Sequence, residues 1–239
     1  MLSGNMKAHL DQIIDKINQG HNFGVIRPSD GEYLILNNHT ITVQAGDDWT
    51  FNSNGILKEH LMNAIKTINP NLYIGIPCNT CGHSPAGMYH DYIERFQVQK
   101  SQLTYANVFC NANWPFFVDF LKSYNKGFHL ITAGTNECDF PIKSRLIIDK
   151  FLVNRWDDCW EKETTRVFDF IKNIEENQLI CFASGPLTKI WIPKCMEMYP
   201  NNTYLDIGSA MDIFTKGDQN ARPYTNQNTH YSKEVCNFA

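Results

Sequence analysis

The sequence predicts an α/β fold in which a mostly parallel central sheet is covered by helices on both faces. Short apolar runs rich in β-branched and aromatic residues recur along the chain, and segments with helical spacing of apolar residues lie between them. Such alternation is typical of parallel sheets, because parallel strands need a long crossover connection that is usually a helix. The chain shows no internal repeat, low-complexity tract or Gly/Ser linker. The simplest expectation is therefore one domain over residues 1–239 with a Rossmann-like three-layer fold.

Six helices and six strands are expected in alternation. The first helix is amphipathic and carries Asp11 and Asp15, which is not typical of a cleaved secretory leader. In the last helix, Leu187, Ile190 and Trp191 lie on one face at helical spacing. The predicted strands are 22–27, 71–76, 104–109, 128–133, 178–183 and 203–207, and the predicted helices are roughly 5–19, 55–67, 86–98, 114–124, 161–176 and 187–199.

The totals exclude several classes of protein. A chain of 239 residues with 43% hydrophobic residues can bury a sizeable core. The net charge is −4 without a long basic run, which disfavours a nucleic-acid partner. No apolar stretch approaches the roughly 20 residues that span a bilayer. We therefore expect a cytoplasmic protein without a transmembrane segment, whose aromatic content is compatible with a homodimer but does not require one.

The eight cysteines favour free thiols. Cys78, Cys81 and His83 lie close enough in sequence to suggest zinc. A structural zinc site commonly takes four ligands from two such knuckles, and the sequence has no second knuckle.

The segment "RPSDGE" places charged residues directly after the first predicted strand. Pro28 and Gly31 interrupt the strand pattern, so Asp30 and Glu32 are expected on a turn. Two nearby carboxylates can bind a hard cation such as magnesium or manganese, which could then accept phosphate oxygens. Arg27 could contact a phosphate or neutralise a carboxylate. The alternative is a solvated Asp-Gly turn with Arg27 in a structural ion pair.

The segment "ASGPLTK" follows the predicted strand 178–183. Ser184 and Gly185 turn the chain, and Pro186 suits the start of a helix because it lacks an amide proton. The amides and the dipole at such a helix end attract anions, phosphate among them. Many ordinary helices begin in the same way, so the motif alone does not establish a binding site.

The segment "DIGSAMD" follows the last predicted strand and ends in a second acid. Asp206 or Asp212 could act as a general base or bind a sugar hydroxyl, although Asp206 could equally cap a short helix. After it comes a polar, irregular C-terminal tail at 215–239, in which Arg222 could close over a diphosphate.

These segments occur in an order that resembles one family. An Arg-x-x-Asp-Gly-Glu segment, then "GIP", "SGP" and "DIGSAMDIF", and a tail with Arg222-x-Tyr224 follow one another from about residue 20 to 225. This order resembles the GT-D type glycosyltransferases, whose metal motif is Asp-x-Glu. Family members usually carry an aromatic residue and a glycine where this chain has Pro28 and Ser29. The resemblance implies a single glycosyltransferase-like domain, a UDP-sugar donor, and a divalent metal held by Asp30 and Glu32.

The expected function is metal-dependent transfer of a hexosyl or pentosyl group from a nucleotide-diphosphate donor, a UDP-sugar, to a glycan, lipid or protein acceptor. Two alternatives stay open: a metal-dependent phosphoester hydrolase, and a non-catalytic nucleotide- or glycan-binding protein. In the expected enzyme, the metal (Mn2+ or Mg2+) is held by Asp30 and Glu32, the donor is contacted by Arg27, Ser184, Gly185, Arg222 and Tyr224, and the base is Asp212 or Asp206.

Overall fold

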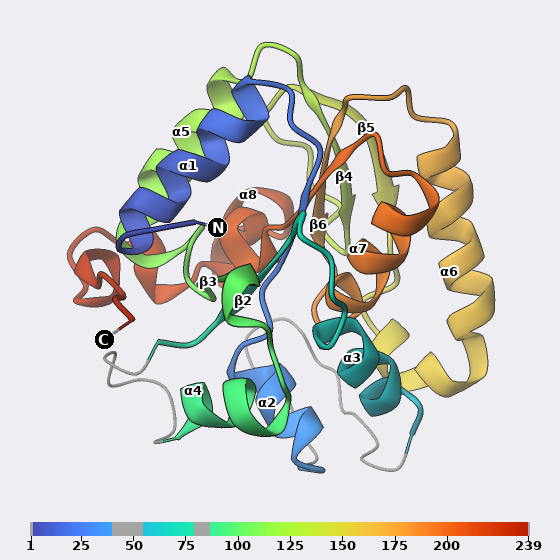
Figure 1. Cartoon of the computed structure of the whole chain (residues 1–239). Coiled ribbons are helices and arrows are strands. Elements are labelled where there is room, and N and C mark those ends of the chain that lie inside the picture. The colour runs from blue at the N-terminus through green and yellow to red at the C-terminus, as the bar shows by residue number, and fades with distance from the viewer. Residues whose placement is uncertain (1, 40–54, 79–86, 239) are drawn as a thin grey trace.

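The computed structural model describes residues 2–39, 55–78 and 87–238. In this part of the chain, seven strands form one sheet, and every neighbouring pair of strands is parallel (Figure 1). The predicted α/β class with a parallel central sheet is confirmed. In sheet order the strands are β3 (Leu103–Tyr105), β2 (Leu72–Ile76), β1 (Gly24–Ile26), β7 (Thr203–Asp206), β6 (Leu179–Ala183), β4 (Phe128–Thr132) and β5 (Ile142–Ile147).

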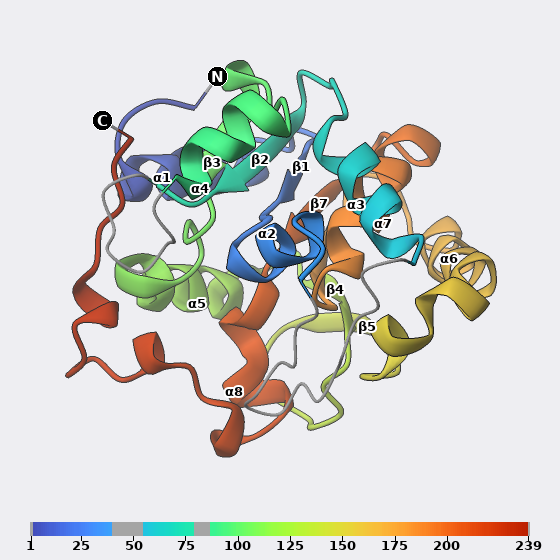
Figure 2. The same cartoon turned by 90° about the horizontal axis from the view of Figure 1, so that it is seen from below.

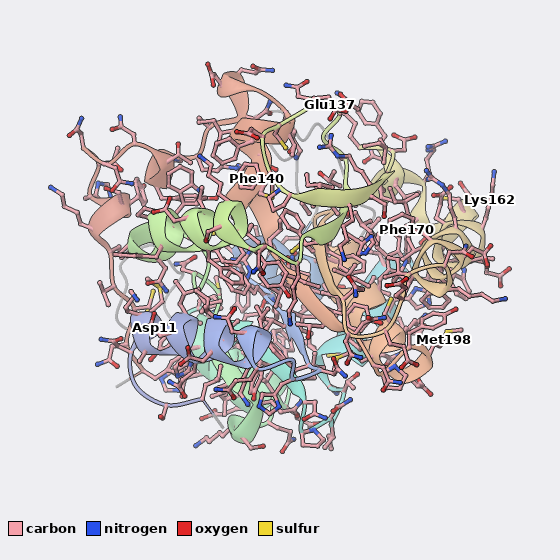
Figure 3. All side chains as sticks on the ribbon, turned by 90° about the horizontal axis from the view of Figure 1, so that it is seen from above. Asp11, Glu137, Phe140, Lys162, Phe170 and Met198 are labelled. Atoms are coloured by element: carbon pink, nitrogen blue, oxygen red, sulfur yellow. The ribbon has the colours of Figure 1, made fainter. Side chains whose placement is uncertain are left out.

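Helices cover both faces of the sheet, which gives three layers. Two helices pack on one face and share a hydrophobic core with it, and three pack on the other. Asp11 and Lys162, which belong to helices of the two different faces, lie on opposite sides of the molecule (Figure 3). The helices of the first face are α1 (Met6–Asn18) and α5 (Trp114–Ser123), and those of the second are α3 (Leu57–Ile65), α6 (Trp156–Lys172) and α7 (Leu187–Met198).

Three further short helices occur among the described residues, and each follows a strand along the chain (Figure 2). They are α2 (Asp30–Leu36), α4 (Met88–His90), which continues as a π-helical turn at Asp91–Arg95, and α8 (Asp212–Thr215).

Helix α1 shows how the sequence pattern determines packing. Met6, Leu10, Ile13 and Ile17 recur at intervals of three or four residues and are buried against the sheet. The helix begins after Asn5, whose side chain accepts a hydrogen bond from the amide of Ala8 at 3.0 Å. The predicted helix at about 5–19 is thus confirmed almost to the residue.

The strand order places a crevice at the centre of the sheet. β1 and β7 are neighbours, but the chain leaves them towards opposite faces: α2 packs into one core through Ile35, and the turn after β7 packs into the other through Met211. Because the two exits diverge, the space above the carboxyl ends of β1 and β7 is left for a ligand.

The six predicted strands are present, and the sheet contains a seventh that the pattern did not predict. β5 is an edge strand in which Lys143 and Ile147 are exposed and the other residues only half-buried, so it lacks the continuous apolar run of the inner strands. β3 is shorter than the predicted 104–109, because the chain turns at Ala106 directly after the strand.

The C-terminal tail is ordered against the rest of the chain. It forms short 3-10 turns at Asp218–Asn220, Pro223–Thr225 and Tyr231–Lys233. Near its end, the carbonyl of Cys236 accepts a hydrogen bond from the amide of Met6 at 3.2 Å. None of the helices in the described ranges combines the length and the apolar character needed to cross a bilayer.

Candidate functional site

A cavity of about 460 Å³ opens at the carboxyl ends of β1, β6 and β7, where the topology leaves a crevice. Segments far apart in the sequence form its walls: the start of α2, the turn before α7, the turn after β7, the segment 148–153 after β5, and the C-terminal tail. Of the nine predicted site residues, eight line this cavity and Asp206 does not. The eight are Arg27, Asp30, Glu32, Ser184, Gly185, Asp212, Arg222 and Tyr224.

The Asp-Gly-Glu segment is the first turn of helix α2, so the prediction that Asp30 and Glu32 lie on a non-helical turn is wrong. Ser29 precedes the helix, and its amide donates to Glu32 Oε2 at 2.9 Å. This is one half of a capping box, which the spacing Ser-x-x-Glu could have revealed. The buried Tyr92 donates its hydroxyl to the Ser29 carbonyl at 2.8 Å and fixes the start of the helix. As a result, Asp30 is exposed at the cavity and Glu32 is buried in its wall.

Arg27 ties three strand ends together. Its guanidinium donates to the carbonyls of Asp206 and Ala106, each at 2.6 Å, and to Cys110 Sγ at 3.4 Å. Burial alone would lower the pKa of Arg27, but the nearby Cys110 and Asp206 outweigh that effect and raise it. The side chain is only 7% exposed. This geometry is that of the structural ion pair, the alternative that the sequence left open.

Asp206 lies beneath the cavity wall. Its Oδ2 accepts from the Arg27 amide at 2.9 Å, and its Oδ1 accepts from the Gly208 amide at 3.1 Å. The residue is fully buried. Because Asp206 does not line the cavity, its carboxylate is poorly placed to take a proton from a bound substrate. Asp206 therefore acts, in this geometry, as an anchor for the strand ends.

Lys189 is a functional candidate that the sequence did not single out. It lies in the first turn of α7, is 5% exposed, and places Nζ 3.1 Å from Glu32 Oε1 and 3.0 Å from Asp206 Oδ2. Burial would lower the pKa of Lys189, but Asp206 and Glu32 outweigh it and raise the pKa above its ordinary value. Its signal in the sequence was a lysine followed directly by the apolar run Ile190–Ile192 in the first half of a helix.

The turn before α7 presents backbone groups to the cavity. Gly185 has a φ of +58°, a left-handed conformation that favours glycine. The amide of Ser184 donates to Thr188 Oγ1 at 3.1 Å. Those of Gly185 and Leu187 have no hydrogen-bond acceptor within the described part of the chain. They sit at the positive end of a twelve-residue helix, which is a favourable place for an anion.

The opposite wall carries Asp212 between two cations. Asp212 is 3% exposed, with Oδ1 at 3.3 Å from Lys216 Nζ and Oδ2 at 3.5 Å from Arg222 Nη2. Tyr224 lies beside them and shares a hydrogen bond with Ser209, with 2.7 Å between the two hydroxyl oxygens. Burial, and then the nearby Cys110, raise the pKa of Tyr224 well above its ordinary value, so it is a neutral phenol. Lys216 had no distinctive signal in the sequence, because its place depends on how the tail folds back.

The donor set tests whether a metal fits. No group of three or more His, Cys, Asp or Glu side chains that could hold a metal occurs among the residues that the structure describes. Both oxygens of Glu32 are engaged, one of them by an ammonium. Asp30 is the exposed carboxylate of the motif, and one carboxylate together with substrate phosphates is a common way to hold Mg2+. The structure therefore fits a metal through Asp30 and does not fit one through Glu32.

The cysteine pair that suggested zinc is only partly described. Cys78 is buried after β2, while Cys81 and His83 lie outside the described residues.

Three solved structures share this fold. One, described as a structure of domain of unknown function 1792, has a TM-score of 0.57 at 14% identity, covering 96% of this chain and 89% of that chain. A second is described as the highly conserved domain of unknown function 1792 with a distinct glycosyltransferase fold (TM-score 0.55, 15% identity, 85% of this chain and 79% of that chain). A third, from Streptococcus sanguinis, is described as a new glycosyltransferase (DUF1792) (TM-score 0.53, 15% identity, 96% of this chain and 92% of that chain). No protein-family model and no curated protein matches the chain.

Proposed function

We propose that this chain is a glycosyltransferase that moves a sugar from a nucleotide diphosphate, a UDP-sugar, to a hydroxyl group of a glycan, lipid or protein. The observation that carries the proposal is the cavity at the central strand ends, which eight separately predicted residues line. The shared fold supports it, because two of the solved structures are described in terms of glycosyltransferases.

The donor diphosphate would lie over the turn before α7. The amides of Gly185 and Leu187 can donate hydrogen bonds to its oxygens, and the helix end adds a favourable potential. Lys216 and Arg222 bring two positive charges to the same cavity. These groups are fixed before the donor binds, which is the condition under which they stabilise a developing negative charge most effectively.

A divalent cation, Mn2+ or Mg2+, would bind through Asp30 and the donor phosphates. When bound, it would supply Lewis-acid stabilisation of the leaving diphosphate. Asp30 suits this role because its carboxylate is exposed at the cavity on the rigid first turn of α2.

Asp212 would take the proton of the acceptor hydroxyl. In an inverting reaction, the acceptor oxygen forms a bond to the anomeric carbon while the bond from that carbon to the diphosphate breaks. The electron pair leaves with the nucleoside diphosphate, and the proton passes to the carboxylate. Lys216 and Arg222 hold the Asp212 carboxylate in place at 3.3 and 3.5 Å, so its position in the cavity is defined.

The test is a product assay on purified protein. With Mn2+ and a panel of hexosyl and pentosyl UDP-sugars, one donor should slowly release UDP and free sugar even without an acceptor. Asp30→Asn should abolish this release, and Asp11→Asn, on the exposed side of α1 (Figure 3), should not. Absence of binding and turnover across the panel would contradict the proposal. Release of phosphate from nucleotides that carry no sugar would indicate a phosphoester hydrolase instead.

A further inference from the structure

The ammonium of Lys189 lies in a nest of oxygen atoms at the floor of the cavity. Glu32 Oε1 is at 3.1 Å, Asp206 Oδ2 at 3.0 Å, and the carbonyl oxygen of Gly185 at 3.2 Å from Nζ. Three acceptors match the three protons of an ammonium group. All three ligands are oxygens, two of them carboxylates, which is also the donor set that hard divalent cations prefer.

We propose that Lys189 occupies the position that a divalent cation would take between Glu32 and Asp206, so that these two acids form no tight metal site in the protein alone. The cation of the proposed reaction then enters together with the donor diphosphate through Asp30. This second half rests on the proposed function, whereas the first half concerns the protein alone.

Three observations support this assignment. First, Glu32 is engaged on both oxygens, by the Ser29 amide and by Lys189, so neither oxygen faces the cavity unpaired. Second, Lys189 is buried between two acids, where an ammonium is favoured over a neutral amine and would repel a second cation. Third, Arg27 Nη2 lies 4.0 Å from Asp206 Oδ1, which adds another positive charge beside the same acid.

The arrangement has a consequence for the order of binding. A metal held by one protein carboxylate is bound weakly until phosphate oxygens complete its coordination. The cation and the nucleotide should therefore bind cooperatively, and neither Glu32 nor Asp206 should be needed as a direct ligand. Lys189 is a positioning residue in this scheme, because it holds Glu32 and the start of α2 rather than touching the reacting atoms.

The first test uses MnCl2 alone, without nucleotide, and measures free Mn2+ by electron paramagnetic resonance. Wild-type protein should bind Mn2+ weakly. Lys189→Met keeps a side chain of similar volume but removes the ammonium, so the three oxygens lose their positively charged partner. This variant should therefore bind Mn2+ at least tenfold more tightly. Lys194→Met, on the same helix but outside the nest, should bind like the wild type. Equal affinity of wild type and Lys189→Met would overturn the proposal.

A second test does not depend on the Lys189 variant being folded. In the presence of UDP, Glu32→Gln should keep Mn2+ affinity within about threefold of wild type, since the amide oxygen can still accept from Ser29. Asp30→Asn should weaken Mn2+ binding at least tenfold. Loss of Mn2+ binding in Glu32→Gln would overturn the proposal. If UDP does not promote Mn2+ binding to the wild type, the proposed function and the cooperative binding fail, while the nucleotide-free titration still decides the role of Lys189.

Discussion

Removing the guanidinium of Arg27 should destabilise the whole fold rather than only weaken ligand binding. Arg27→Met keeps a side chain of similar length but deletes the hydrogen bonds to the carbonyls of Asp206 and Ala106 and to Cys110. Asp206 stays buried with Lys189 as its remaining cationic partner. The change therefore separates the strand ends that meet at the cavity.

The expected loss follows from the burial of this ion pair. Removing one partner of a buried pair typically costs about 3–5 kcal/mol, because the other partner is left under-compensated. A chain of this size loses roughly 2–4 °C of Tm per kcal/mol, so we expect Tm to fall by roughly 6–20 °C. Arg166→Met is a matched control: its side chain is 43% exposed in an ion pair with Glu163, and the expected loss is below about 1 kcal/mol.

Urea denaturation followed by circular dichroism gives the free energy of unfolding of both variants. Equilibrium binding of UDP gives their ligand affinity. A loss below 1 kcal/mol in Arg27→Met, together with loss of UDP binding, would refute the structural role. Arg27 would then be a residue that contacts the nucleotide-sugar donor directly.

Three further predictions concern other parts of the structure. Gly208→Ala should lower the free energy of unfolding by about 1–3 kcal/mol, because a Cβ there would overlap with Arg27 Nη2 and the φ is +51°. Gly20→Ala is the control, since Gly20 has a φ of +73° but open space around it. An equal loss in the two variants, measured by urea denaturation, would contradict the prediction. His9 is buried with a pKa lowered to about 4, so the unfolded chain binds more protons between pH 6.5 and 4. The free energy of unfolding should fall by up to about 3 kcal/mol as the pH drops through that window. The same pH change should lower the stability of His9→Gln by less. Asp212→Asn should lower kcat for transfer by about 10²–10⁴-fold and leave UDP affinity within threefold; an unchanged kcat would exclude it as the base.

Much of the fold could be predicted because inner strands of a parallel sheet are buried on both faces and so form continuous apolar runs. "LYIGI" and "LICFA" are such runs, and all five residues of each strand are buried. β5 was missed because an edge strand needs no such run. Helix α2 was missed because Pro28 and Gly31 carried more weight than the Ser-x-x-Glu cap.

The candidate site could be predicted in its membership but not in its pairing. Residues that follow parallel strands meet at one edge of the sheet, which is why Arg27, Asp30 and Asp212 could be grouped without a structure. The sequence does not show which acid faces the cavity and which lies beneath it, because that depends on side-chain packing. The contact between Asp206 and Lys189 is an example: it joins the end of strand β7 to helix α7, which precedes that strand in the chain.

A co-crystal structure with UDP and Mn2+ tests the central claim most directly, because anomalous scattering locates the manganese independently of the protein. The diphosphate should lie at the amides of Gly185 and Leu187, with manganese beside Asp30 and the Lys189 ammonium still between Glu32 and Asp206. Nucleotide bound outside the cavity would contradict the proposed function. Manganese between Glu32 and Asp206 would contradict the role given to Lys189.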